Sequence, residues 1–107
     1  MAQMILEIPD TLADLPEQER NLLIRAGLYE ATRARIRQLK TEISESKKHV
    51  RRFETRYKAS FSRFEAENLP ILDAMPAHED YNDWFYWESV LAEKQRLLNE
   101  LQSIELN

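Results

Sequence analysis

Hydrophobic residues recur at every seventh position through the middle of the chain. The series is Leu22, Tyr29, Ile36, Ile43, Val50 and Tyr57. A second series lies three residues further on and consists of Arg25, Thr32, Leu39, Ser46 and Phe53. Such heptads predict a long helix with a coiled-coil seam. The seam is good from Ile36 to Tyr57 and mixed before Ile36, because the second series is apolar only in its C-terminal half.

The bounds of this helix follow from its flanking residues. Pro16, followed by Glu17 and Glu19, is a typical helix start. No proline and only Gly27 interrupt the chain from there to Tyr57. We therefore predict a helix over about 17–57, roughly 60 Å long at about 1.5 Å per residue. A helix of this length exceeds the width of so small a domain, so part of it projects or meets another chain.

The segments on either side are shorter. Residues 4–8 read as a short strand or extended arm, closed by Pro9, within an N-terminal arm over 1–15. Ser60 can cap a short helix over about 60–67 that carries Phe61 and Phe64. Residues 69–79 contain Pro70 and Pro76 and are predicted to form the linker.

A second long helix is predicted over about 81–106. Asp80 is the expected N-cap, with Asp83 in the capping-box position. One broad apolar face is expected to carry Trp84, Trp87, Val90, Leu91, Leu97, Leu98, Leu101 and Ile104. Lys94 is the one gap in this face.

These elements predict an all-α fold, a single helical hairpin domain over 16–107. The last helix folds antiparallel onto the C-terminal half of the long one. The expected hairpin core is Ile43, Val50, Phe53, Tyr57, Phe61, Phe64, Trp84, Trp87, Leu91 and Leu98. The last helix is too short to cover residues 17–35, so an apolar face there predicts a subunit or partner interface. The residues expected at that interface are Met4, Leu6, Ile8, Leu22, Leu23, Ala26, Tyr29 and Ile36.

The amino-acid composition of the chain also favours a helical structure. The chain of 107 residues has one glycine and no cysteine, which favours helix and excludes disulfides. No apolar run approaches the roughly 18 residues of a membrane span, and no secretion signal is expected, so we predict a cytoplasmic protein.

The net charge of −4 conceals a basic middle between two acidic ends. Residues 20–58 hold twelve basic and four acidic residues. Lys47, Lys48, Arg51 and Arg52 within this basic stretch could contact nucleic acid. A solvated helix facing the acidic last helix is the favoured interpretation, so nucleic acid is not the expected partner.

We find no arrangement of residues in the sequence that is typical of a catalytic site. His49 and His78 lie on different elements without an acid–base partner at a telling spacing. Glu79, Asp80 and Asp83 could hold a metal beside His78, but helix capping accounts for them more simply. Phosphate-binding glycine loops are absent from the sequence. We expect no enzyme activity, no cofactor and no metal.

Two stretches resemble known proteins. Residues 4–10, followed by 22–30 (LLIRAGLYE), resemble the strand and second helix of ribbon-helix-helix antitoxins that pair with small ribonuclease toxins. Residues 51–65 and 78–88 are similar to small helical proteins of bacteria and archaea often thought to be antitoxins. The resemblance implies a homodimer that binds a toxin. DNA binding is not expected, because residues 1–19 contain no Lys or Arg.

Three functions fit these patterns. The leading hypothesis is a non-catalytic interaction module, an antitoxin-like protein that binds itself and a small cognate toxin. The alternatives are a nucleic-acid-binding regulator that uses the basic helix and a purely structural coiled-coil protein.

Overall fold

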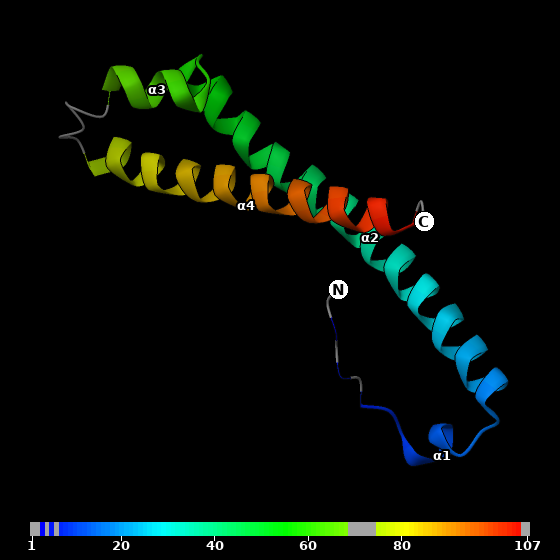
Figure 1. Cartoon of the computed structure of the whole chain (residues 1–107). Coiled ribbons are helices and arrows are strands. Elements are labelled where there is room, and N and C mark those ends of the chain that lie inside the picture. Colours follow the sequence, from blue (N-terminus) through cyan, green and yellow to red (C-terminus); the bar gives the residue numbers. More distant parts are fainter. Residues whose placement is uncertain (1–2, 4, 6, 69–74, 106–107) are drawn as a thin grey trace.

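The computed structural model describes residues 3, 5, 7–68 and 75–105. This part of the chain contains four helices and no strand, which confirms the predicted all-α class. The molecule is elongated, with extents of 66 × 25 × 22 Å. Figure 1 shows two long helices side by side, with one of them continuing well beyond the other.

The longer helix is α2, Glu17–Tyr57, the span that the heptads predict. It begins directly after Pro16, whose carbonyl accepts the N–H of Arg20 at 2.9 Å. It ends where Lys58 adopts a left-handed conformation with φ 53° and donates its N–H to the Glu54 carbonyl. A left-handed residue at this position stops the helix and turns the chain.

A short helix, α3, follows over Phe61–Asn68. Its start is capped by Ser60, whose hydroxyl oxygen accepts the backbone N–H of Arg63 at 3.2 Å. This cap satisfies one of the first-turn amides that have no partner within a helix. The cap thus sets the position of Phe61 and Phe64 relative to the end of α2.

The last helix, α4, spans Met75–Glu105 and begins six residues before the predicted start at residue 81. The linker predicted over 69–79 is therefore shorter, and its residues 69–74 lie outside the described part of the chain. Pro76 is the second helical residue, where a missing N–H costs no intrahelical hydrogen bond. The prediction that Asp80 is the N-cap is also wrong, because α4 begins earlier and Asp80 lies within its second turn.

The seam between α2 and α4 uses both heptad series. The residues of α2 that it buries are Ile36, Leu39, Ile43, Ser46, Val50 and Phe53. Ser46, the polar member, satisfies its hydroxyl by donating to the Glu42 carbonyl at 3.0 Å. Alternating three- and four-residue steps keep these side chains on one side of the helix.

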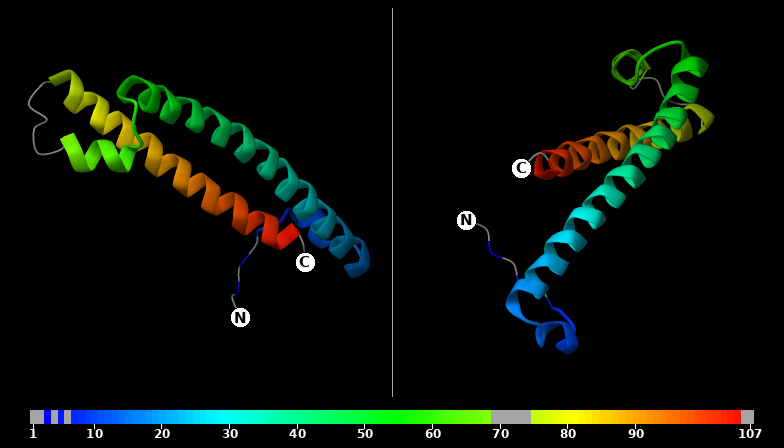
Figure 2. Two further views of the ribbon diagram at one scale, coloured as in Figure 1. Left: turned by 90° about the horizontal axis from the view of Figure 1, so that it is seen from above. Right: turned by 90° about the vertical axis from the view of Figure 1, so that its right-hand side faces the viewer.

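Contacts across the seam run in opposite numerical order along the two helices. Glu42 meets Lys94 at 2.9 Å, and the rings of His49 and Trp87 stack 3.8 Å apart. Arg56 then meets Asp80 at 2.6 Å. Figure 2 shows the two helices alongside each other in its left view and diverging toward the C-terminus of α4 in its right view.

An aromatic cluster closes the end of the pair where α3 lies. Phe53, Phe64 and Trp84 are buried at its centre. The partly buried residues packed against them are Tyr57, Phe61, Tyr81 and Trp87. Trp84 is fully buried, and its ring centroid lies 5.2 Å from that of Phe64 and 5.7 Å from that of Phe53. Aromatic pairs at such distances add to the stabilisation from burial alone.

The expected hairpin core divides into two levels of burial. Ile43 and Val50 are buried with the three residues at the centre of the cluster. The members that stay half-buried are Tyr57, Phe61, Trp87, Leu91 and Leu98. Leu91 and Leu98 belong to α4, so the apolar face of that helix is wider than the seam with α2 covers.

The N-terminal segment contains one helical turn, α1, over Asp10–Ala13. The guanidinium of Arg20 donates to the Ala13 carbonyl at 3.2 Å and ties α1 to the start of α2. Residues 3, 5 and 7–9 are not in regular structure, so the strand alternative for the arm is not formed there.

Within the described part of the chain, the helices offer no stretch long and apolar enough to cross a membrane.

The burial of Trp84 makes it the strongest test of the fold. We expect Trp84→Ala to lower the free energy of unfolding by about 3–5 kcal/mol, because it empties the centre of the cluster. Phe85→Ala is the matched control, since this adjacent side chain is 52% exposed, and it should cost less than about 1 kcal/mol. Chemical denaturation followed by circular dichroism measures both. Equal losses would show that the cluster is not centred on Trp84.

Candidate functional site

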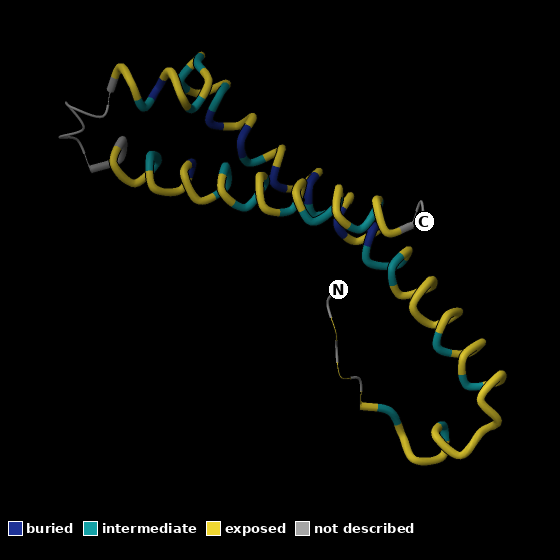
Figure 3. The backbone as a smooth tube through the Cα atoms, in the orientation of Figure 1, coloured by how far each residue is buried: buried dark blue, intermediate teal, exposed yellow. Residues whose placement is uncertain are grey.

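The first half of α2, residues 17–35, extends beyond the reach of α4, and we call it the uncovered half. Four of its large apolar side chains lie in solvent: Leu22, Leu23, Leu28 and Tyr29 are between 51% and 61% exposed, whereas Ile24 is half-buried. Figure 3 shows this stretch of the tube as mostly exposed, in contrast to the buried positions beside α4. Contiguous exposed apolar residues on a helix are typical of an interaction surface.

Two sides of the uncovered half carry apolar residues. Leu22, Leu23, Ala26 and Tyr29 are spaced three or four residues apart and share one side, all of them exposed. Leu28 lies on the opposite side, since two positions along a helix correspond to a turn of about 200°. A helix that is apolar on two sides has more surface to cover than one partner helix can cover.

Tyr29 and Arg33 form a pair one turn apart on this surface. The Arg33 guanidinium donates to the Tyr29 hydroxyl oxygen at 3.1 Å and lies 5.5 Å from the centre of its ring. The two contacts restrain a side chain that is otherwise exposed. The pair therefore presents a partly ordered aromatic and cationic feature beside Ala26.

Ile36 does not belong to the exposed interface to which the sequence assigned it. It is 6% exposed and lies in the seam with α4. α4 ends at Glu105, close to the expected end, and the contacts of Asp80 with Arg56 and of Lys94 with Glu42 place its C-terminal part beside this stretch of α2. The boundary between covered and uncovered parts of α2 falls just before this residue.

The remaining predicted interface residues belong to the arm. Ile8 is half-buried, which places it against the molecule rather than in solvent. Met4 and Leu6 lie outside the described residues. Ile5, between them, is 96% exposed.

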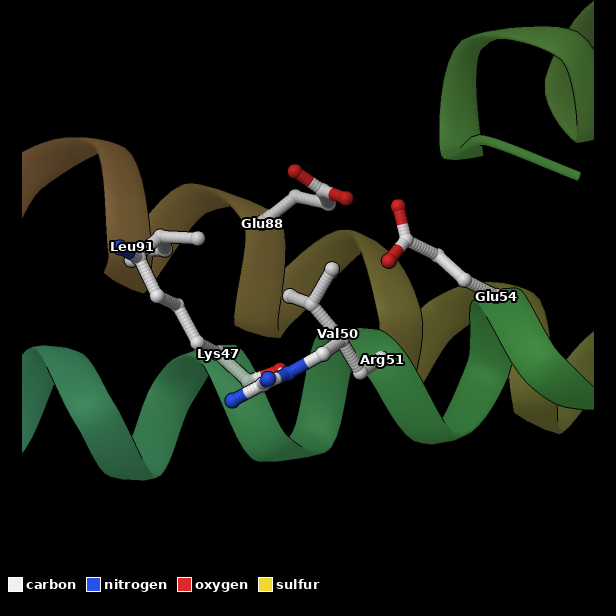
Figure 4. A pocket seen from close by; sticks show the side chains of 6 residues that line it. All are labelled: Lys47, Val50, Arg51, Glu54, Glu88 and Leu91. Atoms are coloured by element: carbon white, nitrogen blue, oxygen red, sulfur yellow. The ribbon is translucent and has the colours of Figure 1, made fainter.

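A groove of about 540 Å³ runs between α2 and α4 near the middle of the seam. It is lined by Lys47, Val50, Arg51, Glu54, Glu88 and Leu91. Figure 4 shows the carboxylates of Glu54 and Glu88 on the same side of the helix pair. Burial raises the pKa of Glu88, the indole N–H of Trp84 opposes that rise, and the charge of Glu54 adds to it.

The four basic residues considered for nucleic acid are all exposed on α2. Lys47 and Arg51 line the groove beside two carboxylates. Lys48 pairs with Glu45 at 3.4 Å, and Arg52 lies 5.5 Å from the Phe53 ring centre. Acidic groups near these cations reduce the attraction that they offer to phosphates.

The two histidines have separate structural surroundings. His49 stacks on Trp87 with ring planes 5° apart, and His78 lies 3.3 Å from the Asn82 amide nitrogen. Among the described residues, no three side chains of the metal-binding types gather at one point. Glu79 and Asp83, the other members of the predicted acidic cluster, are exposed on α4.

Sequence reasoning missed an apolar hollow on the outer side of α4. It has a volume of about 390 Å³ and is lined by Tyr86, Ser89, Val90, Glu93, Lys94 and Leu97. Tyr86, which was not assigned to the predicted apolar face, is 58% exposed and lies beside Val90 and Leu97 of that face. Tyr86, Val90 and Leu97 are four and seven residues apart, which places them on one side of a helix and was the available signal.

Asp80 joins α4 to the end of α2. Its carboxylate accepts hydrogen bonds from the Arg56 guanidinium and from the Tyr57 hydroxyl, each at 2.6 Å. Burial opposes ionisation of Asp80, but the hydrogen bonds and the charge of Arg56 outweigh it, so its pKa lies below the usual 3.8. Burial and the Asp80 hydrogen bond together raise the pKa of Tyr57.

Comparison of the chain with protein-family models, with curated proteins and with solved structures found no match. The candidate site therefore stands on its own geometry.

We expect Asp80→Asn to lower the free energy of unfolding by about 1–2 kcal/mol at neutral pH, because it removes a charged acceptor from two donors. A carboxyl whose pKa is lowered by folding contributes stability above its unfolded pKa, and this contribution is lost as pH falls through the folded value. The difference from the parent chain should therefore disappear below pH 3.8, the ordinary value for Asp80.

Asp83→Asn serves as the control, since Asp83 is exposed on the same helix. Thermal unfolding across the acidic range should show no comparable change for this variant. A loss of stability for Asp80→Asn that stays constant from neutral to acidic pH would contradict the assigned ion pair.

Proposed function

We propose that this protein is a non-catalytic interaction module, an antitoxin-like partner that binds and neutralises a small toxin protein. The observation that carries the proposal is the uncovered half of α2. Its leucines at positions 22, 23 and 28 are each more than 50% exposed. Binding a second protein over this surface would remove that apolar area from water, at a gain of about 25 cal/mol per Å².

The proposed architecture suits this role. The α2–α4 pair acts as an antiparallel coiled-coil hairpin that holds one end of α2 rigid while the other end stays available. The N-terminal arm adds a second element, because an extended segment can pair with a sheet edge of a partner. Neutralisation in this scheme requires only occupation of the toxin surface and no reaction. We propose a cytoplasmic setting, consistent with the absence of cysteine from the sequence.

The resemblance of residues 4–10 and 22–30 to ribbon-helix-helix antitoxins points to the same surface. Residues 22–30 lie in the part of α2 that α4 does not cover. The proposal extends this to two kinds of contact, one with a second copy of the chain and one with the cognate protein. Two apolar sides on the uncovered half provide room for both.

The test is capture of the protein encoded by the adjacent gene. Co-expressed with the tagged chain, that protein should co-purify in a fixed ratio, and its inhibition of growth should be relieved. The variant Leu22→Glu/Leu28→Glu places charge on both sides of the uncovered half and should weaken capture at least about tenfold, the effect expected of losing an interface anchor.

Ile104→Glu is the matched control, because Ile104 is 60% exposed on α4 and lies outside the proposed surface. It should leave capture unchanged, and both variants should keep the circular dichroism and thermal unfolding of the parent chain. Capture that survives Leu22→Glu/Leu28→Glu, or that is lost equally in Ile104→Glu, would refute the proposed surface.

A further inference from the structure

The positions around Ala26 have an internal symmetry. Steps of three, four and seven residues in either direction from Ala26 reach the same side of the helix. Those residues, which we call the Ala26 stripe, are Glu19, Leu22, Leu23, Tyr29, Glu30 and Arg33. All of them, and Ala26 itself, are exposed in the single chain.

We propose that the Ala26 stripe is the contact between two copies of this chain, which cross antiparallel with the two-fold axis at Ala26. The inference rests on the proposed function and names the partner at one side of the uncovered half. An isologous contact of this kind pairs each residue with its reflection across the axis. Glu19 then faces Arg33 of the partner subunit, and Leu23 faces Tyr29 of the partner subunit.

Charge complementarity favours this orientation over a parallel one. The stripe is acidic seven residues before Ala26 and basic seven residues after it. An antiparallel crossing sets Glu19 opposite Arg33 twice, whereas a parallel crossing sets Glu19 against Glu19 and Arg33 against Arg33. Like charges placed opposite each other are unfavourable, and opposite charges fix the register of such contacts.

The arginine is held in a position that suits the contact. Its guanidinium is bonded to the Tyr29 hydroxyl at 3.1 Å and lies over the ring of the same residue. Tyr29 and Arg33 therefore form one unit, which the partner meets with Leu23 and Glu19. Restraint of the side chains before binding reduces the entropy lost on association.

The centre of the stripe allows close approach of the helices. Ala26 has the smallest side chain of the stripe, and the separation of packed helices depends on the side chains at the contact. Glu30 faces Leu22 of the partner subunit, and this pair is the least favourable one in the contact. The stripe supplies seven residues per chain, fewer than the roughly 20–30 per side of a standard interface, so we expect a weak dimer.

The fold leaves space for this partner. Seen from Ala26, the centre of the seam formed by Ile36, Leu39 and Ile43 lies about 100° around the helix axis, at 3.6 residues per turn. Leu22 and Tyr29 form the edge of the stripe nearest the seam, since they belong to the same seven-residue series as Ile36. The second copy has room there because α4 does not extend over residues 17–35. Leu28 lies opposite the stripe and stays open for the cognate protein.

Charge reversal tests the orientation. Glu19→Arg and Arg33→Glu should each raise the dissociation constant of the dimer at least about fivefold, because each turns two attractive pairs into repulsive ones. The double variant Glu19→Arg/Arg33→Glu restores opposite charges across the axis and should return to nearly the parent value. Sedimentation equilibrium of the full chain over a range of concentrations measures all four proteins.

Single cysteines test the position of the axis, since the chain has no cysteine of its own. Ala26→Cys should form a disulfide-linked dimer under mild oxidation at least about tenfold faster than Leu28→Cys, because only the former places two thiols at the axis within disulfide distance. Leu28 is 58% exposed, so its thiol would be equally open to oxidant.

If the double charge variant dimerises no more tightly than the single variants, the antiparallel contact is wrong. Equal cross-linking of both cysteine variants, or a parent chain that stays monomeric at its highest soluble concentration, would overturn it as well. Capture of the adjacent gene's product separates the two proposals. A monomeric chain that still captures this product contradicts the dimer alone, whereas a dimer that fails to capture it contradicts the proposed function.

Discussion

The packing of a 41-residue helix against one of 31 residues governs the whole molecule. At about 1.5 Å per residue, α2 is roughly 15 Å longer than α4. α4 also begins beside α3, past the end of α2, so the part of α2 without an intrachain partner helix is longer than this difference (Figure 1). The end at which the shortfall appears is decided by the aromatic cluster around Trp84. This cluster fixes the start of α4 beside the end of α2, and the uncovered half is consequently the N-terminal one.

Electrostatics reinforce the same register. Asp80 binds Arg56 and Tyr57 near the cluster, and Lys94 occupies a seam position where Glu42 meets it at 2.9 Å. A lysine in a seam is costly unless it is paired, so this contact specifies alignment more than it adds stability. Polar pairs at both places oppose any slip of α4 along α2, and the uncovered half keeps its length.

The sequence predicted the parts of the fold that depend on local pattern. Seven-residue spacing and Pro16 gave the bounds of α2, and the capping role of Ser60 was foreseen because it depends on one residue and its neighbours. The start of α4 was missed because Pro76 is tolerated in a first turn. Asp80 was taken for a cap, since its partners lie 23 and 24 residues away and no local rule reveals such a pairing.

The candidate site, like the fold, was predicted from the sequence only in part. Exposure of Leu22, Leu23 and Tyr29 followed from counting helix lengths, but the burial of Ile36 depends on the register of α4 along α2, which is set by contacts between residues far apart in the sequence. We infer that the chain itself protects only the C-terminal half of α2, while the N-terminal half is protected by a second molecule. Amide hydrogen exchange along α2 at increasing protein concentration distinguishes the two halves. Slow exchange over 36–57 at every concentration, with exchange over 17–35 slowing only as concentration rises, is the predicted result. Uniform, concentration-independent protection of both halves would contradict it.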